Sequence, residues 1–322
     1  MTATDWIALV VAKKAPLAEG VMGFELRAAD GRDLPAFTPG AHVAVRAPNG
    51  LERKYSLAND PDERDHYLLG VKREPNGRGG SASMVDDIIE GQTLQVSTPR
   101  NDFPLKPNPA GYILIAGGIG ITPIVSMARH LLNTGVANFH VYYCTRDAAS
   151  TAFLDDLKGP DFRGKVTVHH DGGDPAKALD FWPILERPKG QHIYCCGPRG
   201  LMDAVRDMTG HWPTSAVHFE AFSEAEANRP DDVAFTVKLR PSGETIKVPA
   251  GVTILDALRA AGHQLASSCE SGTCGTCRTE LVSGEADHRD LALTEDERQR
   301  YIMICVSRAK SPELLLDLGS NL

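Results

Sequence analysis

The chain has 322 residues, of which 42% are hydrophobic, and a formal net charge of −8. This length predicts about two or three domains, and the mild acidity argues against nucleic acid as a partner. An apolar run near the start, residues 6–12, is too short for a membrane span or a signal peptide. We therefore expect a cytoplasmic protein, in a reducing compartment that suits free thiols.

Residues 5–104 are predicted to form an antiparallel barrel of short β-strands. The segments AHVAVRA, RKYSLAN, HYLLGVKR and TLQVSTP are rich in residues that favour strands, and glycine-containing turns separate them. A short helix is expected at residues 81–89, because apolar residues there recur on one helical face and Gly91 follows.

Two motifs in this barrel suit an anion. In RKYS, Arg53 can pair with a phosphate, Tyr55 can act as an aromatic plate, and Ser56 can donate a hydrogen bond. Residues 76–81, NGRGGS, lead directly into the predicted helix, so that glycine N–H groups, the helix dipole and the Arg78 side chain converge on one point. An exposed strand face and a flexible hairpin loop are the alternatives for the two motifs.

Residues 106–226 alternate between strands and helices, which is typical of a parallel α/β sheet. The stretch AGGIGITP follows the buried strand YILIA and opens a helix, so its glycines would let a pyrophosphate approach the helix N-terminus. Thr122 is expected to cap this helix and Pro123 to lie in its first turn. Because Pro123 stands where a third glycine would be, the motif differs from the dinucleotide fingerprint G-x-G-x-x-G. A glycine turn needed only for packing is the alternative.

Two further positions follow strands of this sheet. Cys196 ends the strand HIYCC and precedes a helix, a place where ligands bind in open α/β sheets. Cys195 and Cys144 are expected in the core. Arg146 and Asp147 follow the second strand, where an acidic residue can accept a hydrogen bond from a ribose 2′-OH and an arginine can bind a 2′-phosphate. These two residues alone leave the choice of coenzyme open.

A third domain is predicted after an acidic linker at residues 223–232. A hairpin turns at residues 241–243, and Thr253 caps a helix that ends at Gly262. Two strands, one helix and the cysteine-rich loop that follows indicate a β-grasp ferredoxin. The predicted domains are therefore residues 1–105, 106–226 and 227–322.

Four cysteines in this third domain carry the most specific pattern in the chain. The loop CESGTCGTC holds three of them with the spacing C-x4-C-x2-C, and a fourth follows at a distance, which is the plant-type arrangement for a [2Fe–2S] cluster. Gly272 and Gly275 give the backbone the freedom to wrap such a cluster. A zinc site is the alternative, although zinc usually takes two close pairs of ligands. The four expected ligands are Cys269, Cys274, Cys277 and Cys305.

Taken together, these motifs resemble the ferredoxin–NADP reductase superfamily. RKYS, GRGGS, GGIGITP, CGP and HFEAF occur in the order of that superfamily, and the ferredoxin pattern narrows the resemblance to the phthalate dioxygenase reductase and vanillate demethylase reductase family. The resemblance implies a multidomain α+β and α/β protein: an antiparallel FMN-binding β-barrel, a parallel α/β NAD-binding domain and a β-grasp ferredoxin domain. It also implies electron transfer from NADH through FMN and the cluster to a separate Rieske-type oxygenase of an aromatic acid.

The resemblance also assigns roles to single residues. Tyr55 would pack on the flavin ring, Ser56 would face its N5 atom and Cys196 would lie near the nicotinamide C4 atom, so Ser56 and Cys196 are the expected catalytic residues. A single phosphate-binding loop favours FMN. The residues expected around the flavin are Arg53, Tyr55, Ser56, Lys72, Arg73, Arg78, Gly79, Gly80, Ser81, Thr122, Phe222 and Ser223. Those expected around the nucleotide are Gly118, Gly120, Pro123, Arg146, Asp147, Cys196, Gly197 and Pro198.

Two other functions fit the same motifs. In the first, the electron acceptor is a cytochrome P450 or another haem oxygenase in place of a Rieske-type enzyme. In the second, the protein is a flavin-free ferredoxin-type electron carrier, and the first two domains serve as a docking scaffold. Visible absorbance separates the carrier from the enzymes, because a ferredoxin alone lacks flavin bands.

Overall fold

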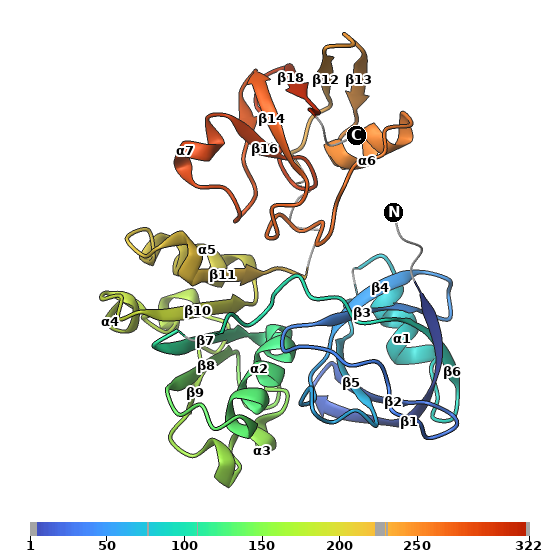
Figure 1. Cartoon of the computed structure of the whole chain (residues 1–322), viewed down its shortest axis with the longest axis vertical. Helices are drawn as coiled ribbons and strands as arrows, with labels where there is room; N and C mark the ends of the chain where they lie inside the picture. Colours follow the sequence, from blue (N-terminus) through green and yellow to red (C-terminus); the bar gives the residue numbers. More distant parts are fainter. Residues whose placement is uncertain (1–4, 76, 108, 223–228, 230, 320–322) are drawn as a thin grey trace. The chain divides into compact units, whose positions relative to one another are not determined.

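The computed structural model describes residues 5–75, 77–107, 109–222, 229 and 231–319 (Figure 1). The chain divides into two compact units, Met1–His218 and Phe219–Leu322. The first unit carries an antiparallel sheet and a parallel sheet, and the second unit carries a mixed sheet. The predicted fold class is confirmed, whereas the exact domain boundaries stay predictions. In the described part of the chain, every helix is too short or too polar to span a membrane.

The antiparallel sheet has the strand order β4-β3-β6-β1-β2-β5. Its two outer strands meet through a bridge between Leu57 and Leu69, so the sheet closes on itself. Buried side chains such as Phe24, Val43 and Tyr67 fill the interior. The strands are β1 (Trp6–Ala18), β2 (Val21–Arg27), β3 (His42–Arg46), β4 (Glu52–Ser56), β5 (Tyr67–Lys72) and β6 (Thr93–Ser97), with helix α1 (Gly80–Asp87) between the last two.

The parallel sheet has the order β11-β10-β7-β8-β9. Its central strand β7 is buried along its whole length, as expected for a parallel strand covered on both faces. The elements are β7 (Gly111–Gly117), α2 (Ile121–Asn133), β8 (Phe139–Thr145), α3 (Leu154–Leu157), β9 (Val166–His170), α4 (Trp182–Leu185), β10 (Gln191–Cys196), α5 (Arg199–Met208) and β11 (Val217–Glu220). From β7 the chain runs outward through β8 and β9, and then crosses to β10 on the other side of β7. The switch point of the sheet therefore lies between β7 and β10.

The second unit contains a five-stranded mixed sheet with the order β13-β12-β18-β14-β16. Strands β12 and β18 are parallel, and the hairpin predicted between β12 and β13 is confirmed. Helix α6 packs on this sheet through Ile254, Leu255 and Leu258, and the Thr253 hydroxyl accepts a hydrogen bond from the Asp256 N–H at 3.0 Å, as predicted. The elements are β12 (Phe235–Arg240), β13 (Thr245–Val248), α6 (Ile254–Ala260), β14 (Arg278–Ser283), β15 (Ala286–Asp287), α7 (Glu295–Arg298), β16 (Tyr301–Met303), β17 (Arg308–Ala309) and β18 (Glu313–Asp317).

A buried ion network joins the start of this second unit to its sheet. The Asp232 carboxylate lies 2.6 Å from the Arg289 guanidinium and 3.5 Å from that of Arg308. The three side chains are only 4%, 6% and 3% exposed, respectively. Burial by itself would raise the pKa of Asp232, but hydrogen bonds from Arg289 and the Arg229 N–H outweigh it and lower that pKa. Asp232 is therefore the shared anion of two buried cations.

Candidate functional site

The four cysteines of the predicted cluster site come together as two pairs in the second unit. Cys269, Cys274 and Cys277 lie on the loop between α6 and β14, and Cys305 follows β16. The Cys269 thiol is hydrogen-bonded to that of Cys274, and the Cys277 thiol to that of Cys305. Among the described residues, no three His, Cys, Asp or Glu side chains gather around one point as ligands of a single ion. Two pairs of thiols are what the two irons of a [2Fe–2S] cluster require.

Backbone N–H groups point at the sulfur atoms of the first pair. Cys274 N–H and Ser271 N–H donate to Cys269 Sγ at 3.3 and 3.4 Å, and Cys269 N–H donates to Cys274 Sγ at 3.4 Å. The pKa of Cys269 is lowered, first by the hydrogen bond from Cys274 and then by those from the hydroxyls of Ser271 and Thr273. These donors stabilise the thiolate, which is the form that ligates iron.

The glycines of this loop are required by its conformation. Gly272 has φ +77°, and a Cβ there would lie 2.6 Å from the Val306 side chain. Gly275 has φ +81° and faces open space. A residue with a side chain would strain the backbone at both positions. The loop therefore fits a cluster, with Gly272 packed inward and Gly275 half-buried beside the ligands.

Sequence reasoning missed the group that braces the loop from helix α6. Arg259 donates to the Glu270 carboxylate at 2.9 Å, and the Ser267 hydroxyl donates to the same oxygen at 2.5 Å. Glu270 has φ +56°, which costs about 1–2 kcal/mol for a residue other than glycine. The two hydrogen bonds offset that cost. The sequence did contain a clue to this contact, because a glutamate stands between two ligand cysteines and an arginine lies on the helix before them.

The two glycine-containing loops of the first unit meet at the switch point of the parallel sheet. A Cβ at Gly120 would collide with the Cys196 carbonyl, and a Cβ at Gly117 would lie 2.6 Å from the Pro198 ring. Gly118, by contrast, has φ +52° and open space where its Cβ would be. Packing thus explains Gly117 and Gly120, while Gly118 leaves room for a ligand to approach the backbone.

Helix α2 begins differently from the prediction. Its N-cap is Gly120, and no side chain caps it. Thr122 is the second helical residue, 2% exposed, and its hydroxyl donates to the Ile119 carbonyl at 3.1 Å. The expected capping role of Thr122 was therefore wrong. The chain enters the helix through the short 3-10 turn Gly118–Gly120, where the carbonyls of Gly118 and Ile119 accept the Ile121 N–H. Pro123 lies in the first turn of α2, as predicted.

The other residues predicted around the nucleotide follow β8 and β10. Cys196 is 0% exposed and belongs to the apolar core beside β7; Cys195 is also 0% exposed, and burial raises its pKa. Cys144 is only partly buried. Arg146 and Asp147 are exposed beyond β8, and the Asp147 carboxylate accepts the Ser150 N–H at 2.9 Å. That hydrogen bond is the main cause of the lowered pKa of Asp147, so the group is an anion at neutral pH.

The barrel brings together the two motifs that were expected to bind an anion. Arg53, on β4, lies across the first residue of α1, since a Cβ at Gly80 would come within 2.5 Å of its side chain. On the same strand, the buried Tyr55 hydroxyl has no hydrogen-bond partner among the described residues, and burial raises its pKa to about 12. Ser56 is 4% exposed. A cradle of glycine backbone with an unpaired phenol beside it fits a polar aromatic cofactor.

The basic residues predicted next to the flavin are placed around the same loop. Lys72 lies 2.6 Å from the Glu74 carboxylate, and Arg73 forms a bidentate pair with Asp86, so both carry carboxylate partners. The Ser81 hydroxyl accepts the Glu74 N–H at 3.1 Å and closes the loop. Arg78 is exposed, and Gly79 beside it has φ +84°. Phe222 is 47% exposed, and Ser223 lies outside the described residues.

A sheet with a nucleotide loop at its switch point and a unit with two cysteine pairs define an oxidoreductase that couples a nicotinamide nucleotide to an iron–sulfur cluster. Residues 237–310 match the 2Fe-2S iron-sulfur cluster binding domain, and residues 114–169 match the oxidoreductase NAD-binding domain. The chain is 52% identical to phthalate dioxygenase reductase of Burkholderia cepacia over 97% of its own length and 98% of that protein. The chain belongs to the phthalate dioxygenase reductase family, as its motifs predicted.

Solved structures agree with this assignment. A structure titled phthalate dioxygenase reductase, described as modular for electron transfer from pyridine nucleotides to [2Fe-2S], matches with a TM-score of 0.74 at 52% identity. The match covers 97% of this chain and 98% of that one. An intact type IV self-sufficient cytochrome P450 monooxygenase matches with a TM-score of 0.70 at 36% identity, over 97% of this chain and 41% of that longer one.

Proposed function

We propose that this protein takes electrons from NADH and passes them through FMN and a [2Fe–2S] cluster to a separate oxygenase in the cytoplasm. The observation that carries the proposal is the pairing of Cys269 with Cys274 and of Cys277 with Cys305, in a chain that also holds a nucleotide loop. We assign the three steps to residues 1–105, 106–226 and 227–322. When bound, FMN supplies the chemistry that accepts a hydride and releases electrons one at a time.

The side chains of the barrel would bind and orient the flavin. Arg53 and Arg78, with the N–H groups at the start of α1, would hold its phosphate. Tyr55 would pack on the ring, and its unpaired hydroxyl would gain a partner. Ser56 would face the reacting edge. A single phosphate-type loop supports FMN over FAD.

The parallel sheet would hold NADH at its switch point. Gly118 would admit the pyrophosphate, Asp147 would accept a hydrogen bond from the ribose 2′-OH, and Cys196 would lie beside the nicotinamide. Hydride transfer requires the nicotinamide C4 atom and the flavin N5 atom at near contact. These residues therefore act by orienting the nucleotide and not by transferring protons. Phe222, half exposed here, is the residue that the family resemblance assigns to the face of the flavin ring.

The partner is a Rieske-type oxygenase of an aromatic acid in this proposal, as the family resemblance implies. The relative from Burkholderia cepacia is named for a dioxygenase, which supports an oxygenase as the acceptor. A haem oxygenase is the second candidate, because the matching P450 monooxygenase contains a reductase-like stretch of this length. Turnover of the purified oxygenases with this reductase and NADH separates the two.

The purified protein is expected to contain one FMN and one [2Fe–2S] cluster per chain. Acid extraction followed by chromatography identifies the flavin, and metal analysis counts iron and zinc. FAD in the extract would show that the loop at Gly79–Ser81 had been misassigned. Zinc without iron would overturn the cluster, and a flavin-free protein with iron would leave the ferredoxin-type carrier as the function.

NADH is expected to exceed NADPH in kcat/KM by at least about tenfold, which requires roughly 1.4 kcal/mol of discrimination. The ionised Asp147 repels a 2′-phosphate, while Arg146 attracts it, and we expect the anion to prevail. Steady-state kinetics with a dye acceptor measure the ratio. Asp147→Ser should lower it, whereas Asp155→Asn, an exposed acid on α3, should leave it unchanged. An equal or reversed preference in the natural protein would mean that Arg146 dominates.

A further inference from the structure

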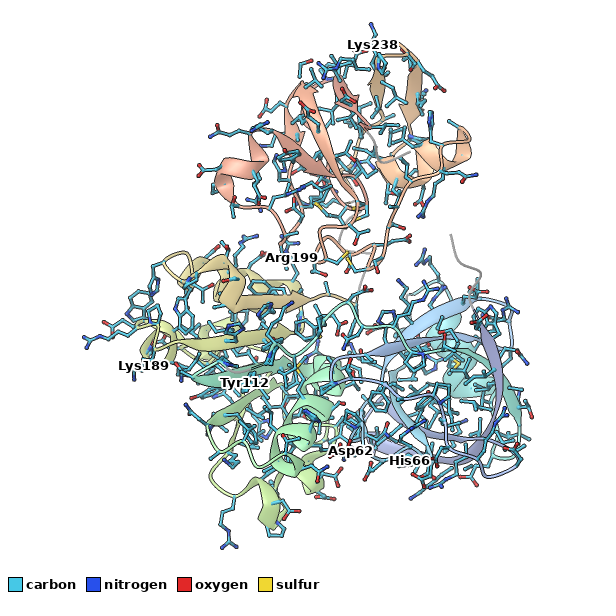
Figure 2. The ribbon with its side chains drawn as sticks, in the orientation of Figure 1. Asp62, His66, Tyr112, Lys189, Arg199 and Lys238 are labelled. Carbon is cyan, nitrogen blue, oxygen red and sulfur yellow. The ribbon has the colours of Figure 1, made fainter. Side chains whose placement is uncertain are left out.

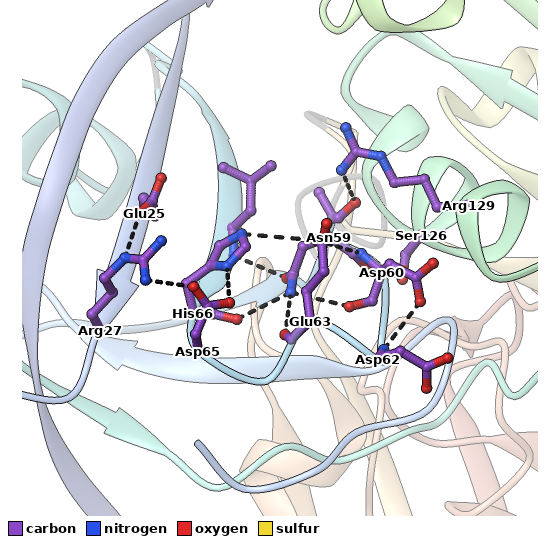
Figure 3. Close-up of polar contacts among 12 residues, drawn as sticks. Glu25, Arg27, Asn59, Asp60, Asp62, Glu63, Asp65, His66, Ser126 and Arg129 are labelled. Atoms are coloured by element: carbon purple, nitrogen blue, oxygen red, sulfur yellow. Dashed lines mark hydrogen bonds and ion pairs between the residues drawn. The ribbon is translucent and has the colours of Figure 1, made fainter. Parts of the chain in front are cut away.

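Helix α2 carries a row of polar side chains that faces the barrel. The row consists of Ser126, Arg129 and Asn133. Arg129 follows Ser126 by three residues and Asn133 follows it by seven, so the three side chains share one helical face. The Ser126 hydroxyl donates to the Asn59 carbonyl at 2.8 Å, and Arg129 donates to the Ala58 carbonyl at 2.7 Å (Figure 3). The same helix begins directly after the loop that contains Gly118. One element thus reaches both the nucleotide loop and the barrel.

The two carbonyls belong to a loop that leaves the flavin strand. Residues 57–66, which we call the Asn59 loop, connect β4, with Tyr55 and Ser56, to β5. Asn133 also reaches this loop, because its side chain donates to the Asp62 carboxylate at 2.7 Å; Asp62 lies where the barrel meets the parallel sheet (Figure 2). The contact is therefore between the end of β4 and the middle of α2.

The Asn59 loop is itself stiff. The Asn59 side chain is 0% exposed and makes four hydrogen bonds inside the loop and to β5 (Figure 3). Its amide donates to the carbonyls of Asp60, Glu63 and His66 at 3.3, 3.1 and 3.0 Å, and its oxygen accepts the Leu68 N–H at 3.0 Å. A displacement of α2 is therefore passed on to β5 through the Asn59 side chain, and to the end of β4 through the two residues that join Ser56 to Asn59.

Arg129 is held on three sides. Besides the Ala58 carbonyl, its guanidinium contacts the Asp156 carboxylate at 2.7 Å and lies 5.8 Å from the centre of the Phe153 ring. Ser126 is fully buried, so its hydroxyl has no access to water that could replace the Asn59 carbonyl. The apolar side chains of Ile121 and Val125 pack in the same cluster as Ala58 and Leu68, and the two donors fix the position of the loop backbone within that packed contact.

We propose that Ser126 and Arg129 are positioning residues for hydride transfer: they set the distance between the flavin strand β4 and the nucleotide loop at the start of α2. The inference rests on the proposed function, since it takes β4 to hold the flavin and α2 to follow the nucleotide. Reacting atoms must approach to about 3–3.5 Å, and a displacement near 1 Å can cost about 100-fold in rate. Two hydrogen bonds at this contact therefore influence the rate without touching either cofactor.

The test uses the full holoprotein and stopped-flow reduction of its flavin by NADH. Arg129→Met removes both donors but keeps a long apolar stem, and Ser126→Ala removes the buried hydroxyl. Each is expected to slow flavin reduction by about 10- to 100-fold, while the NADH dissociation constant and the FMN content stay within about twofold. Arg129→Lys retains one donor and should recover part of the rate. The long-wavelength absorbance of nicotinamide stacked on oxidised flavin should weaken in step with the rate.

Asn133→Ala is the matched control, because the hydrogen bond that it removes is exposed to water and ends on the Asp62 side chain, so it does not hold the backbone of the Asn59 loop. Its rate should equal that of the natural protein. Natural rates and unchanged absorbance in both Arg129→Met and Ser126→Ala would overturn the inference, as would a loss of rate that merely follows loss of FMN. If NADH failed to reduce the flavin of the natural protein, that result would overturn the proposed function instead.

Discussion

Cys274→Ser is expected to abolish electron delivery to any one-electron partner protein while NADH still reduces the flavin. Cys274 forms one of the two thiol pairs, and a serine hydroxyl, which is protonated at neutral pH, is a much weaker iron ligand than a thiolate. The loss should exceed about 100-fold, because even changes to groups behind the metal ligands cost 10- to 100-fold. Reduction of a haem protein such as cytochrome c measures delivery, and stopped-flow bleaching of the flavin measures the hydride step.

Cys144→Ser is the control for this experiment. Cys144 is also a free cysteine, but it lies on β8 in the first unit, so the variant should keep both activities. Undiminished delivery by Cys274→Ser would remove Cys274 from the ligand set. A folded Cys274→Ser protein whose flavin no longer reacts with NADH would contradict the assignment of the hydride step to residues 1–226.

Asp232→Ala is expected to destabilise the second unit by about 3–5 kcal/mol, the usual result of removing one partner from a buried ion pair. The change removes the anion that Arg289 and Arg308 share; these side chains are 6% and 3% exposed, and Arg289 keeps the Asp287 carboxylate at 2.6 Å. Against a total stability of about 5–15 kcal/mol, such a loss should release the cluster at low denaturant concentration. Urea unfolding followed by the visible absorbance of the cluster measures it.

Glu285→Ala provides a matched comparison in the same unit. Its carboxylate lies 3.7 Å from Lys310, but both side chains are more than half exposed. An exposed pair contributes about 0–1 kcal/mol, so this variant should unfold almost as the natural protein does. If Asp232→Ala costs no more than Glu285→Ala, the buried network does not stabilise the unit.

The sequence predicted elements with local signals and missed those that depend on tertiary contacts. Thr253 and Gly262 mark the two ends of α6, and both act within one turn of chain. Strands β1 and β2 were not identified individually, because residues 6–27 show weak alternation, although the two strands form a local hairpin that turns between Ala18 and Val21. Thr122 fits the rule for a helix cap, yet the preceding 3-10 turn takes that role.

The candidate site divides in the same way. The spacing of the four cysteines identified the cluster loop, because three of the four ligands lie close together in the sequence, in a pattern typical of a [2Fe–2S] cluster. The Arg259–Glu270 brace and the bonds from Ser126 and Arg129 were not predicted, since each joins a helix to a loop that only folding brings near. The sequence around a single polar residue on a helix does not indicate which distant carbonyl its side chain will bond to.

The hydrogen bonds between α2 and the Asn59 loop also bear on how proteins of this kind can recombine. A crossover between two relatives at residues 98–110 would join a barrel from one parent to a parallel sheet from the other, and so would separate Ser126 and Arg129 from the loop selected to fit them. A crossover just after β11 breaks none of these bonds and leaves the parallel sheet whole. Inheritance should therefore keep the barrel and the parallel sheet together as one piece that ends after β11, while the ferredoxin part is the piece that lineages can exchange to acquire new electron acceptors.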